Sequence, residues 1–181
     1  MDKVVSKIIY CSIMKAVIYI MGVAGSGKTT IAKLLSAETA IPFFDADDFH
    51  PAVNILKMKA GRPLNDEDRQ PWLAVLNKLA AEQAQLKGAI IACSALKDKY
   101  RLLLQSGIAE CKWIFLQGSY GVIYERMKNR NHQYMTEQLL QSQFESLEIP
   151  ASALVIDINN EPATIVEIIR QYLSKKITTR F

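Results

Sequence analysis

An eight-residue segment near the N-terminus constrains the fold of this chain more than any other feature of its sequence. Residues 22–29 read Gly-Val-Ala-Gly-Ser-Gly-Lys-Thr, which matches the pattern GxxxxGK[ST]. The segment follows an apolar run at 16–21 and precedes a helix-like stretch at 30–40. A strand, a glycine-rich turn and a helix in this order surround phosphate oxygens with backbone N–H groups, in front of the positive end of the helix. The segment therefore predicts a nucleotide phosphate site within an α/β domain.

The chemistry expected at this loop is phosphoryl transfer. Lys28 can reach the β- and γ-phosphates of ATP, and the Thr29 hydroxyl can ligate Mg²⁺. We therefore expect ATP and Mg²⁺ to be bound here, with Lys28 among the catalytic residues. A chance turn rich in glycine and serine is the alternative, and the strand and helix on either side count against it. The expected ATP-binding residues of the loop are Gly22, Val23, Ala24, Gly25, Ser26, Gly27, Lys28, Thr29 and Thr30.

The rest of the chain alternates between short apolar runs and longer helix-like stretches. The runs are continuously apolar, which is typical of parallel strands covered on both faces by helices. Right-handed crossovers then place them in one doubly wound α/β sheet. A helix is expected from 67 to 86, after a cap at Asn65 and Asp66 and before Gly88. The expected strands lie at 16–21, 41–44, 89–93, 112–116 and 153–158, and a last helix at 162–173.

The length and charge of the chain limit its organisation and its partners. With 181 residues, half of them apolar, the chain can form one domain core and is too short for two ordinary ones. We expect a single domain at 16–176, preceded by an N-terminal extension at 1–15. The net charge of +4 is modest, and the basic residues are scattered among acidic ones. No nucleic-acid partner is therefore expected.

Cysteine usage and hydropathy bear on the cellular compartment. Cys11, Cys93 and Cys111 are widely spaced and form no CxxC pair, so neither a disulfide framework nor a zinc site is indicated. Lys15 separates the apolar run at 8–14 from the next one, which leaves no segment long enough for a membrane helix. A cytoplasmic protein without a membrane partner is expected.

The second expected strand ends in a group of acidic residues. Residues 45–51 read Asp-Ala-Asp-Asp-Phe-His-Pro at the carboxyl edge of the sheet, where ligands bind in folds of this class. One carboxylate could accept the proton of an attacking hydroxyl, and another could hold the shell of Mg²⁺. The alternative is an aspartate-rich turn that only caps the next helix, and residues 45–51 alone leave both interpretations open.

Cations follow in two later segments. Arg62 stands in a Gly-Arg-Pro-Leu loop, where an arginine suits bidentate contact with a carboxylate. Lys57 and Lys59 are interpreted as solvated helix charges. Residues 93–101, after the third expected strand, add hydroxyl groups and further cations at the same sheet edge. Tyr100 could equally belong to the core.

The phosphate loop and four later motifs occur together in one order along the chain. The later motifs are Asp45-x-Asp47-x-x-His50-Pro51, Gly61-x-Pro63-Leu64-x-Asp66-x-Asp68-Arg69-x-Pro71-Trp72, Cys93-Ser94-Ala95-Leu96-Lys97 and Tyr100-Arg101. Over residues 16–173 the chain thereby resembles the gluconokinase family. The resemblance implies a three-layer P-loop kinase fold similar to shikimate and adenylate kinases, with a five-stranded parallel sheet of order 2-3-1-4-5 and a helical lid. It also implies transfer of phosphate from ATP, with Mg²⁺, to the 6-hydroxyl of D-gluconate, and a homodimer.

The resemblance also implies roles for individual residues of the acceptor site. Asp47 becomes the catalytic residue that orients and deprotonates the acceptor hydroxyl. Arg62 is expected at the carboxylate of the sugar acid, and Ser94 in the water shell of the Mg²⁺ that Thr29 ligates. The implied substrate-binding residues are Asp47, His50, Arg62, Lys97 and Arg101.

A lid is expected over residues 120–148, as two helix-like stretches joined by polar residues. In related kinases, arginines of this region close over ATP and exclude water. Arg126 and Arg130 are therefore expected to bind ATP, with Arg126 also catalytic. An ordinary solvated helix face is the alternative. The turn at 157–162 is expected to pack against adenine through backbone groups.

Other functions remain open from the sequence. Asp48, Asn131 and Gln133 depart from the family pattern, so a related kinase acting on shikimate or another sugar acid is the first alternative. A module that binds a nucleotide to control a partner is the second, and the acceptor motifs count against it. A GTPase would need a base-specificity motif such as NKxD, which is missing at an appropriate place.

Overall fold

Five parallel strands form the centre of the molecule. The computed structural model describes residues 15–128 and 136–175. Within them the strands lie in the order β2-β3-β1-β4-β5, and each adjacent pair is parallel. The predicted α/β sheet of order 2-3-1-4-5 is confirmed. The strands are β1 (Val17–Met21), β2 (Phe43–Asp45), β3 (Ala89–Ala92), β4 (Cys111–Gln117) and β5 (Leu154–Asp157).

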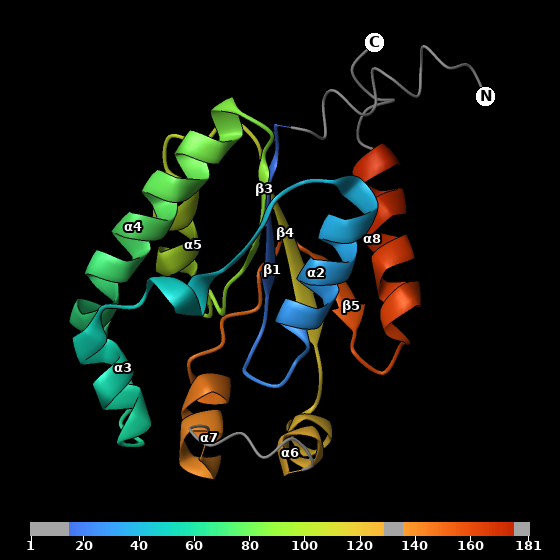
Figure 1. The fold of residues 1–181 in the computed structure, drawn as a ribbon. Coiled ribbons are helices and arrows are strands. Elements are labelled where there is room, and N and C mark those ends of the chain that lie inside the picture. The colour runs from blue at the N-terminus through green and yellow to red at the C-terminus, as the bar shows by residue number, and fades with distance from the viewer. Residues whose placement is uncertain (1–14, 129–135, 176–181) are drawn as a thin grey trace, which may run out of the picture.

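Helices cover both faces of this sheet and one of its ends. In Figure 1, α4 and α5 lie on one face, and α2 and α8 lie on the other, which makes three layers. The α6 and α7 helices lie beyond the end of the sheet where the β1–α2 loop turns. The helices are α2 (Lys28–Thr39), the short 3₁₀ helix η1 (Ala46–Phe49), α3 (Ala52–Lys59), α4 (Asp66–Gln85), α5 (Asp98–Gln105), α6 (Tyr120–Lys128), α7 (Glu137–Glu145) and α8 (Pro162–Lys175).

The central strand β1 explains why the strands are continuously apolar. All of its residues are buried, and successive side chains enter different cores. Ile18 and Ile20 pack among the residues of α2 and α8, whereas Tyr19 and Met21 pack with those of α4 and α5. Because side chains alternate between the faces of a strand, two covered faces require apolar residues at every position. Because β1 is buried on both faces, its carboxyl end, where the phosphate loop begins, has a fixed position in the sheet.

The boundaries of α4 match the prediction closely. Asn65 caps the helix by accepting a hydrogen bond from the Asp68 N–H (2.8 Å), and the Asp68 carboxylate accepts one from the Asn65 N–H (3.0 Å). Such a reciprocal capping box satisfies two donors that the first turn would otherwise leave unpaired. The helix ends at Gln85, before Gly88.

The interpretation of Lys57 as a solvated charge is wrong. The Lys57 ammonium lies 2.7 Å from both carboxylate oxygens of Asp68. The capping box turns the Asp68 carboxylate toward the preceding helix α3, which carries Lys57 near its end. Hydrogen bonds from Lys57 and then from the Asn65 backbone lower the pKa of Asp68. The ion pair therefore joins α3 to the start of α4.

No helix in the described ranges 15–128 and 136–175 is long and apolar enough to cross a membrane.

Candidate active site

The phosphate loop turns between β1 and α2 as predicted. Gly27 immediately precedes α2 with a positive φ of 94°, and no described atom lies within 4 Å of the position that its Cβ would occupy. The helix begins without a side-chain cap, so its first N–H groups are available to an anion. The Ser26 hydroxyl is buried and has no hydrogen-bond partner among the described residues. These features fit a bound nucleotide phosphate.

Lys28 folds back across the loop that it terminates. Its ammonium donates a hydrogen bond to the Val23 carbonyl at 3.0 Å. Burial lowers the pKa of Lys28, and Asp47, Cys93 and Asp45 oppose this change, Asp47 most strongly. The loop therefore holds a cation close to Asp47, in the acidic turn that follows β2.

Asp45 connects the phosphate loop to the acidic turn. Its Oδ2 accepts a hydrogen bond from the Thr29 hydroxyl at 2.8 Å, and its Oδ1 accepts one from the Asp47 N–H at 3.2 Å. The sequence placed Asp45 in the acidic turn but not among the site residues. Its position as the last residue of β2 could have identified it, because the carboxyl ends of parallel strands meet at one edge.

Asp45 and Thr29 are also the groups that suit a magnesium ion. In proteins Mg²⁺ is held by one or two carboxylates together with substrate phosphates and water. Among the described residues no group of three or more His, Cys, Asp and Glu side chains could hold a metal ion by itself. One carboxylate and one hydroxyl next to a phosphate site therefore fit Mg²⁺ better than a metal that requires a full set of protein ligands.

Asp47 lies beside His50 in the acidic turn. Its side chain is 85% exposed, and its Oδ1 lies 3.9 Å from the His50 Nε2. Surrounding protein atoms reduce the hydration of the carboxyl and raise the pKa of Asp47; Lys28 opposes this change, and Asp45 and Asp48 add to it. Asp47 thus combines access to solvent with a higher affinity for protons than an ordinary aspartate has.

His50 is held in place by Trp72 from helix α4. The two rings stack with centroids 4.3 Å apart and planes 11° from parallel. The Trp72 indole N–H donates a hydrogen bond to the Ala46 carbonyl at 2.7 Å, within the same acidic turn. Burial, with a smaller contribution from Arg69, lowers the pKa of His50 to about 4. The imidazole is therefore neutral near pH 7, and its Nε2 is the nitrogen that faces Asp47.

Lys97 belongs to a cluster around Asp66. The Asp66 carboxylate accepts hydrogen bonds from Lys97 at 3.1 Å, from Lys99 at 2.6 Å and from the Tyr100 hydroxyl. Hydrogen bonds from Lys99, Tyr100 and Lys97, in that order, lower the pKa of Asp66. The Tyr100 side chain is buried, so its ring belongs to the core while its hydroxyl reaches this cluster.

The two arginines expected at the substrate lie in different environments. Arg62 is exposed. Arg101 is 4% exposed, and its guanidinium donates to the Ala95 carbonyl at 2.9 Å, the Leu96 carbonyl at 3.1 Å and Asp98 at 3.1 Å. In this arrangement Arg101 supports the loop that follows β3, and its hydrogen-bond donors face the protein. Substrate contact by Arg101 stays a prediction, and its observed partners favour a structural role.

The loop after β3 also contacts the phosphate loop. The Ser94 carbonyl accepts a hydrogen bond from the Gly22 N–H at 3.4 Å. Ser94 is half-buried. The structure thus brings Ser94 next to the start of the phosphate loop, as expected for parallel strands β1 and β3, while its role in a metal shell stays a prediction.

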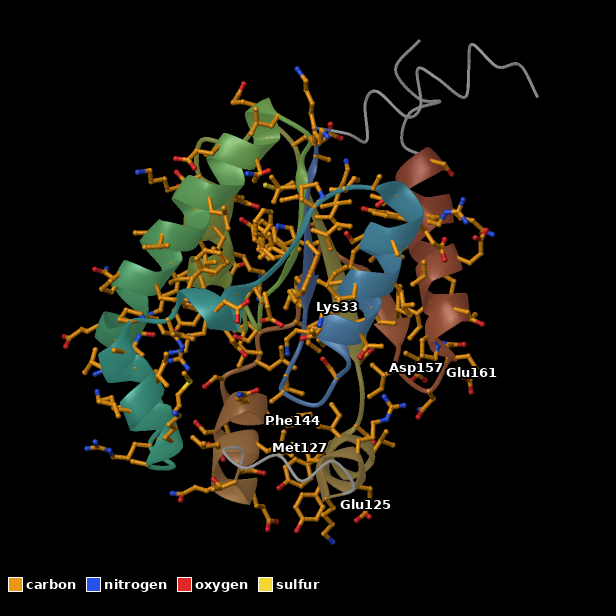
Figure 2. All side chains as sticks on the ribbon, viewed as in Figure 1. Lys33, Glu125, Met127, Phe144, Asp157 and Glu161 are labelled. Carbon is orange, nitrogen blue, oxygen red and sulfur yellow. The ribbon has the colours of Figure 1, made fainter. Side chains whose placement is uncertain are left out.

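Two helices of the expected lid lie against the phosphate loop. A Cβ on Gly25 would meet Met127 at 3.0 Å and Ile123 at 3.2 Å, both on α6. Figure 2 shows Met127 on α6 and Phe144 on α7 beneath the loop, and both belong to the core on the α2 side. Side chains of α6 therefore pack closely against the loop at Gly25, and a larger residue there would have to displace them.

Arg126 and a glutamine that the sequence did not single out make the polar contacts of these helices. The Arg126 guanidinium donates to the Ile158 carbonyl at 2.7 Å, in the turn expected at adenine. The Gln143 Oε1 accepts a hydrogen bond from the Ala24 N–H at 2.7 Å. No motif marks Gln143 in the sequence. Arg130, Asn131 and Gln133 lie outside the described residues.

Comparisons with known proteins agree with this geometry. Residues 24–175 match the model of the shikimate kinase family. The chain is 41% identical to the thermoresistant gluconokinase of Escherichia coli (strain K12) over 161 residues, which cover 84% of this chain and 92% of that protein.

Two solved structures are similar in sequence as well as in fold. A sugar kinase from Janibacter sp. HTCC2649 superposes with a TM-score of 0.82 at 41% identity, covering 86% of this chain and 92% of that one. A gluconokinase from Sinorhizobium meliloti 1021 superposes with a TM-score of 0.81 at 36% identity, covering 90% and 93%. The chain has a phosphate loop with Lys28 and an acidic turn joined to it through Asp45, and it is similar to these relatives. It is therefore an ATP-dependent kinase that belongs to the gluconokinase family.

Proposed function

We propose that the protein transfers the γ-phosphoryl group of ATP to the 6-hydroxyl of D-gluconate, forming 6-phospho-D-gluconate. The observation that carries the proposal is the chain of hydrogen bonds from Thr29 through Asp45 to the Asp47 backbone. It joins a phosphate loop to an acidic turn that can receive a hydroxyl. The similar gluconokinases from Escherichia coli and Sinorhizobium meliloti support gluconate as the acceptor.

The nucleotide half of the site binds and orients the triphosphate. Backbone N–H groups of the loop and of the first turn of α2 cradle phosphate oxygens, and Lys28 supplies a positive charge where negative charge gathers during transfer. Arg126, which donates to the Ile158 carbonyl, is proposed to add a second cation from the lid side. Phosphoryl transfer depends mainly on alignment and charge neutralisation, which these groups provide.

Magnesium is the metal that we propose for this site, with Thr29 as its ligand. In this proposal Asp45, and Ser94 through water, complete its shell. When bound, Mg²⁺ would neutralise part of the negative charge of the phosphates. The Thr29 hydroxyl already lies 2.8 Å from the Asp45 carboxylate, so a hydroxyl and a carboxylate stand together beside the phosphate loop.

The acceptor half of the site orients and deprotonates the sugar hydroxyl. Asp47 accepts the hydroxyl proton, and a raised pKa makes it a stronger base than an ordinary aspartate. Neutral His50 presents Nε2 beside Asp47 and orients the same hydroxyl. Arg62 and Lys97 provide positive charge for the substrate carboxylate, and Arg101 supports the loop that carries Lys97.

The compartment and assembly that we propose follow from the family. The family suggests a homodimer. A cytoplasmic location suits the two described cysteines, Cys93 and Cys111, which are free thiols. Cys93 is buried, and burial raises the pKa of its thiol to about 12, so it is protected from oxidation. Light scattering coupled to size-exclusion chromatography measures the mass in solution, and a monomer would reject the dimer.

A substrate panel tests the proposed function. ADP release is coupled to NADH oxidation with ATP, Mg²⁺ and one acceptor at a time: gluconate, other aldonates, shikimate or a nucleoside monophosphate. We expect the highest kcat/KM with gluconate. Faster turnover with shikimate or another sugar acid would reassign the acceptor. ATP binding without turnover on any acceptor would favour a nucleotide-dependent binding module.

A further inference from the structure

The peptide group between Val23 and Ala24 is held at both of its ends. Its carbonyl, on Val23, accepts hydrogen bonds from the Lys28 ammonium at 3.0 Å and from the Ser26 N–H at 3.3 Å. Its N–H, on Ala24, donates to the Gln143 side chain at 2.7 Å. Because a peptide group is planar and its N–H and C=O point in opposite directions, Gln143 and Lys28 hold opposite ends of one rigid unit.

Gln143 reaches this peptide from a firmly anchored helix. On α7, Leu140 is fully buried in the core on the α2 side, and Phe144 packs against the same core. Just beyond the helix, the Glu148 N–H donates to the Leu96 carbonyl at 2.8 Å, and the Glu148 carboxylate accepts from the Asp98 N–H. The helix is thus fixed on both sides of Gln143, and its amide oxygen is held toward the loop.

The direction of the Val23 carbonyl matters for the charge that binds phosphate. Lys28 is the cation of the loop, and the Val23 carbonyl is its hydrogen-bond acceptor within the loop. If the Val23–Ala24 peptide rotated, the carbonyl would turn away and the ammonium would lose that anchor. Gln143 opposes this rotation from the N–H end. Gln143, 119 positions from Ala24 in the sequence, thus contacts the same peptide group that anchors Lys28.

We propose that Gln143 is a positioning residue of the phosphate loop, which acts through the Val23–Ala24 peptide on Lys28 and thereby on affinity for ATP. The inference rests on the proposed function only in so far as the loop binds ATP, and it is independent of which acceptor is phosphorylated. Gln143 differs from the arginines of the lid because it acts on the protein backbone and not on the nucleotide.

The test compares Gln143→Met with Gln141→Met. Methionine preserves the length and helix propensity of glutamine and removes the amide acceptor. Gln141 lies on the same helix, but it is exposed, and its side-chain amide donates to Glu145 at 3.0 Å. The control variant therefore repeats the chemical change without touching the loop, and circular dichroism and thermal melting verify that both variants fold.

Binding of a non-hydrolysable ATP analogue is measured by calorimetry without any acceptor. We expect Gln143→Met to weaken it about three- to tenfold, the range for loss of one hydrogen bond, and Gln141→Met to leave it unchanged. In turnover, KM for ATP should rise in Gln143→Met while KM for gluconate stays the same. Equal affinity in the two variants would overturn the proposal, and so would tighter binding by Gln143→Met, because Gln143 would then compete with the nucleotide. Failure of the wild-type protein to bind the analogue would reject ATP binding itself.

A second measurement does not depend on the nucleotide or on the methionine variant. In ¹H–¹⁵N spectra of the free protein, a short hydrogen bond to Gln143 should shift the Ala24 amide proton downfield and protect it from solvent exchange. Gln143→Glu keeps an acceptor oxygen and should retain both properties. Rapid exchange of the Ala24 amide in the wild-type protein would contradict the contact from which the proposal starts.

Discussion

Lys28 carries the nucleotide chemistry at the scale of single residues. Its ammonium lies within the loop against the Val23 carbonyl and near Asp47, whose charge favours the protonated form against the effect of burial. A cation held in this way neutralises charge on a transferring phosphoryl group without rearrangement. No other side chain of the loop can supply that charge.

Removal of this ammonium should abolish turnover. We expect Lys28→Ala to lower kcat by about a hundred- to a thousandfold or more, since a preorganised electrostatic contact of this kind is typically worth 10²–10³. The coupled ADP-release assay measures the loss. Circular dichroism should show an unchanged fold, and undiminished turnover would rule out the role of the loop.

Asp47 is expected to act as the base, and Asp48 provides a matched control. Asp47→Asn preserves shape but cannot accept the hydroxyl proton, so kcat should fall by about 10²–10⁴, as for loss of general base catalysis. Asp48 is the adjacent exposed carboxylate, and Asp48→Asn should change kcat far less. Steady-state kinetics at saturating ATP measure both variants. Equal effects of the two substitutions would reject Asp47 as the base.

His50 should make stability depend on pH in acidic solution. Its pKa is about 4 in the folded protein against 6.5 for an ordinary histidine, so the unfolded chain binds more protons between these values. The stabilisation is therefore complete above pH 6.5 and is lost progressively as pH falls toward 4. Urea unfolding across this range should show a steeper decline for the wild-type protein than for His50→Gln. Parallel curves would contradict a buried neutral imidazole.

At the scale of elements, the turn after β4 is tightly packed against the turn after β5. A Cβ on Gly118 would lie 2.3 Å from the Ile158 Cδ1 and 2.8 Å from its Cγ1. Ile158 is 1% exposed, so it has little room to move, and its carbonyl accepts the Arg126 hydrogen bond. The residues just before α6 therefore pack against Ile158, in the loop that is expected to contact adenine.

A pair of glycine substitutions tests this packing. Gly118→Ala should destabilise the fold by about 1–3 kcal/mol, the usual cost of overpacking a core, and should raise KM for ATP by displacing Ile158. Gly121 lies within α6, and no described atom is within 4 Å of the position of its Cβ. Gly121→Ala should therefore stabilise the protein by about 0.5–1 kcal/mol. Denaturant unfolding measures both free energies, and destabilisation of similar size in the two variants would contradict the account.

Regular elements were predictable from the sequence, and several side-chain partnerships were not. The apolar runs predicted all five strands. In β1 and β3 every residue is buried, and a strand covered on both faces must be apolar at every position. The cap of α4 was predicted in part. Asn65 caps the helix, whereas Asp66, which was expected to share that role, is its first residue and accepts hydrogen bonds from Lys97 and Lys99. The contact of Gln143 with Ala24 was not predictable, since no local pattern marks a pair that lies 119 residues apart. Distance does not explain the other two misses, because Asp68 lies 11 residues from Lys57 and the partners of Arg101 lie three to six residues from it. These contacts depend on how the intervening turns fold, and no motif marks that folding.

At the scale of the whole molecule, the topology brings distant segments to one edge of the sheet. Strand β1 leads to Lys28, β2 to Asp45 and Asp47, and the loop after β3 to Ser94. The order β2-β3-β1 places these carboxyl ends side by side, with α6 and α7 packed beneath the phosphate loop. A nucleotide site and an acceptor site are adjacent because parallel strands end at the same edge.

Identification of the phosphorylated product tests the central claim most directly. The protein is incubated with ATP, Mg²⁺ and D-gluconate, and the product is analysed by ¹H–³¹P correlation NMR, with Lys28→Ala as the inactive control. We expect a single phosphomonoester coupled to the two protons on carbon 6, formed by the wild-type protein and missing with Lys28→Ala. A phosphate on another carbon, no phosphorylated gluconate, or equal product from the variant would contradict the claim.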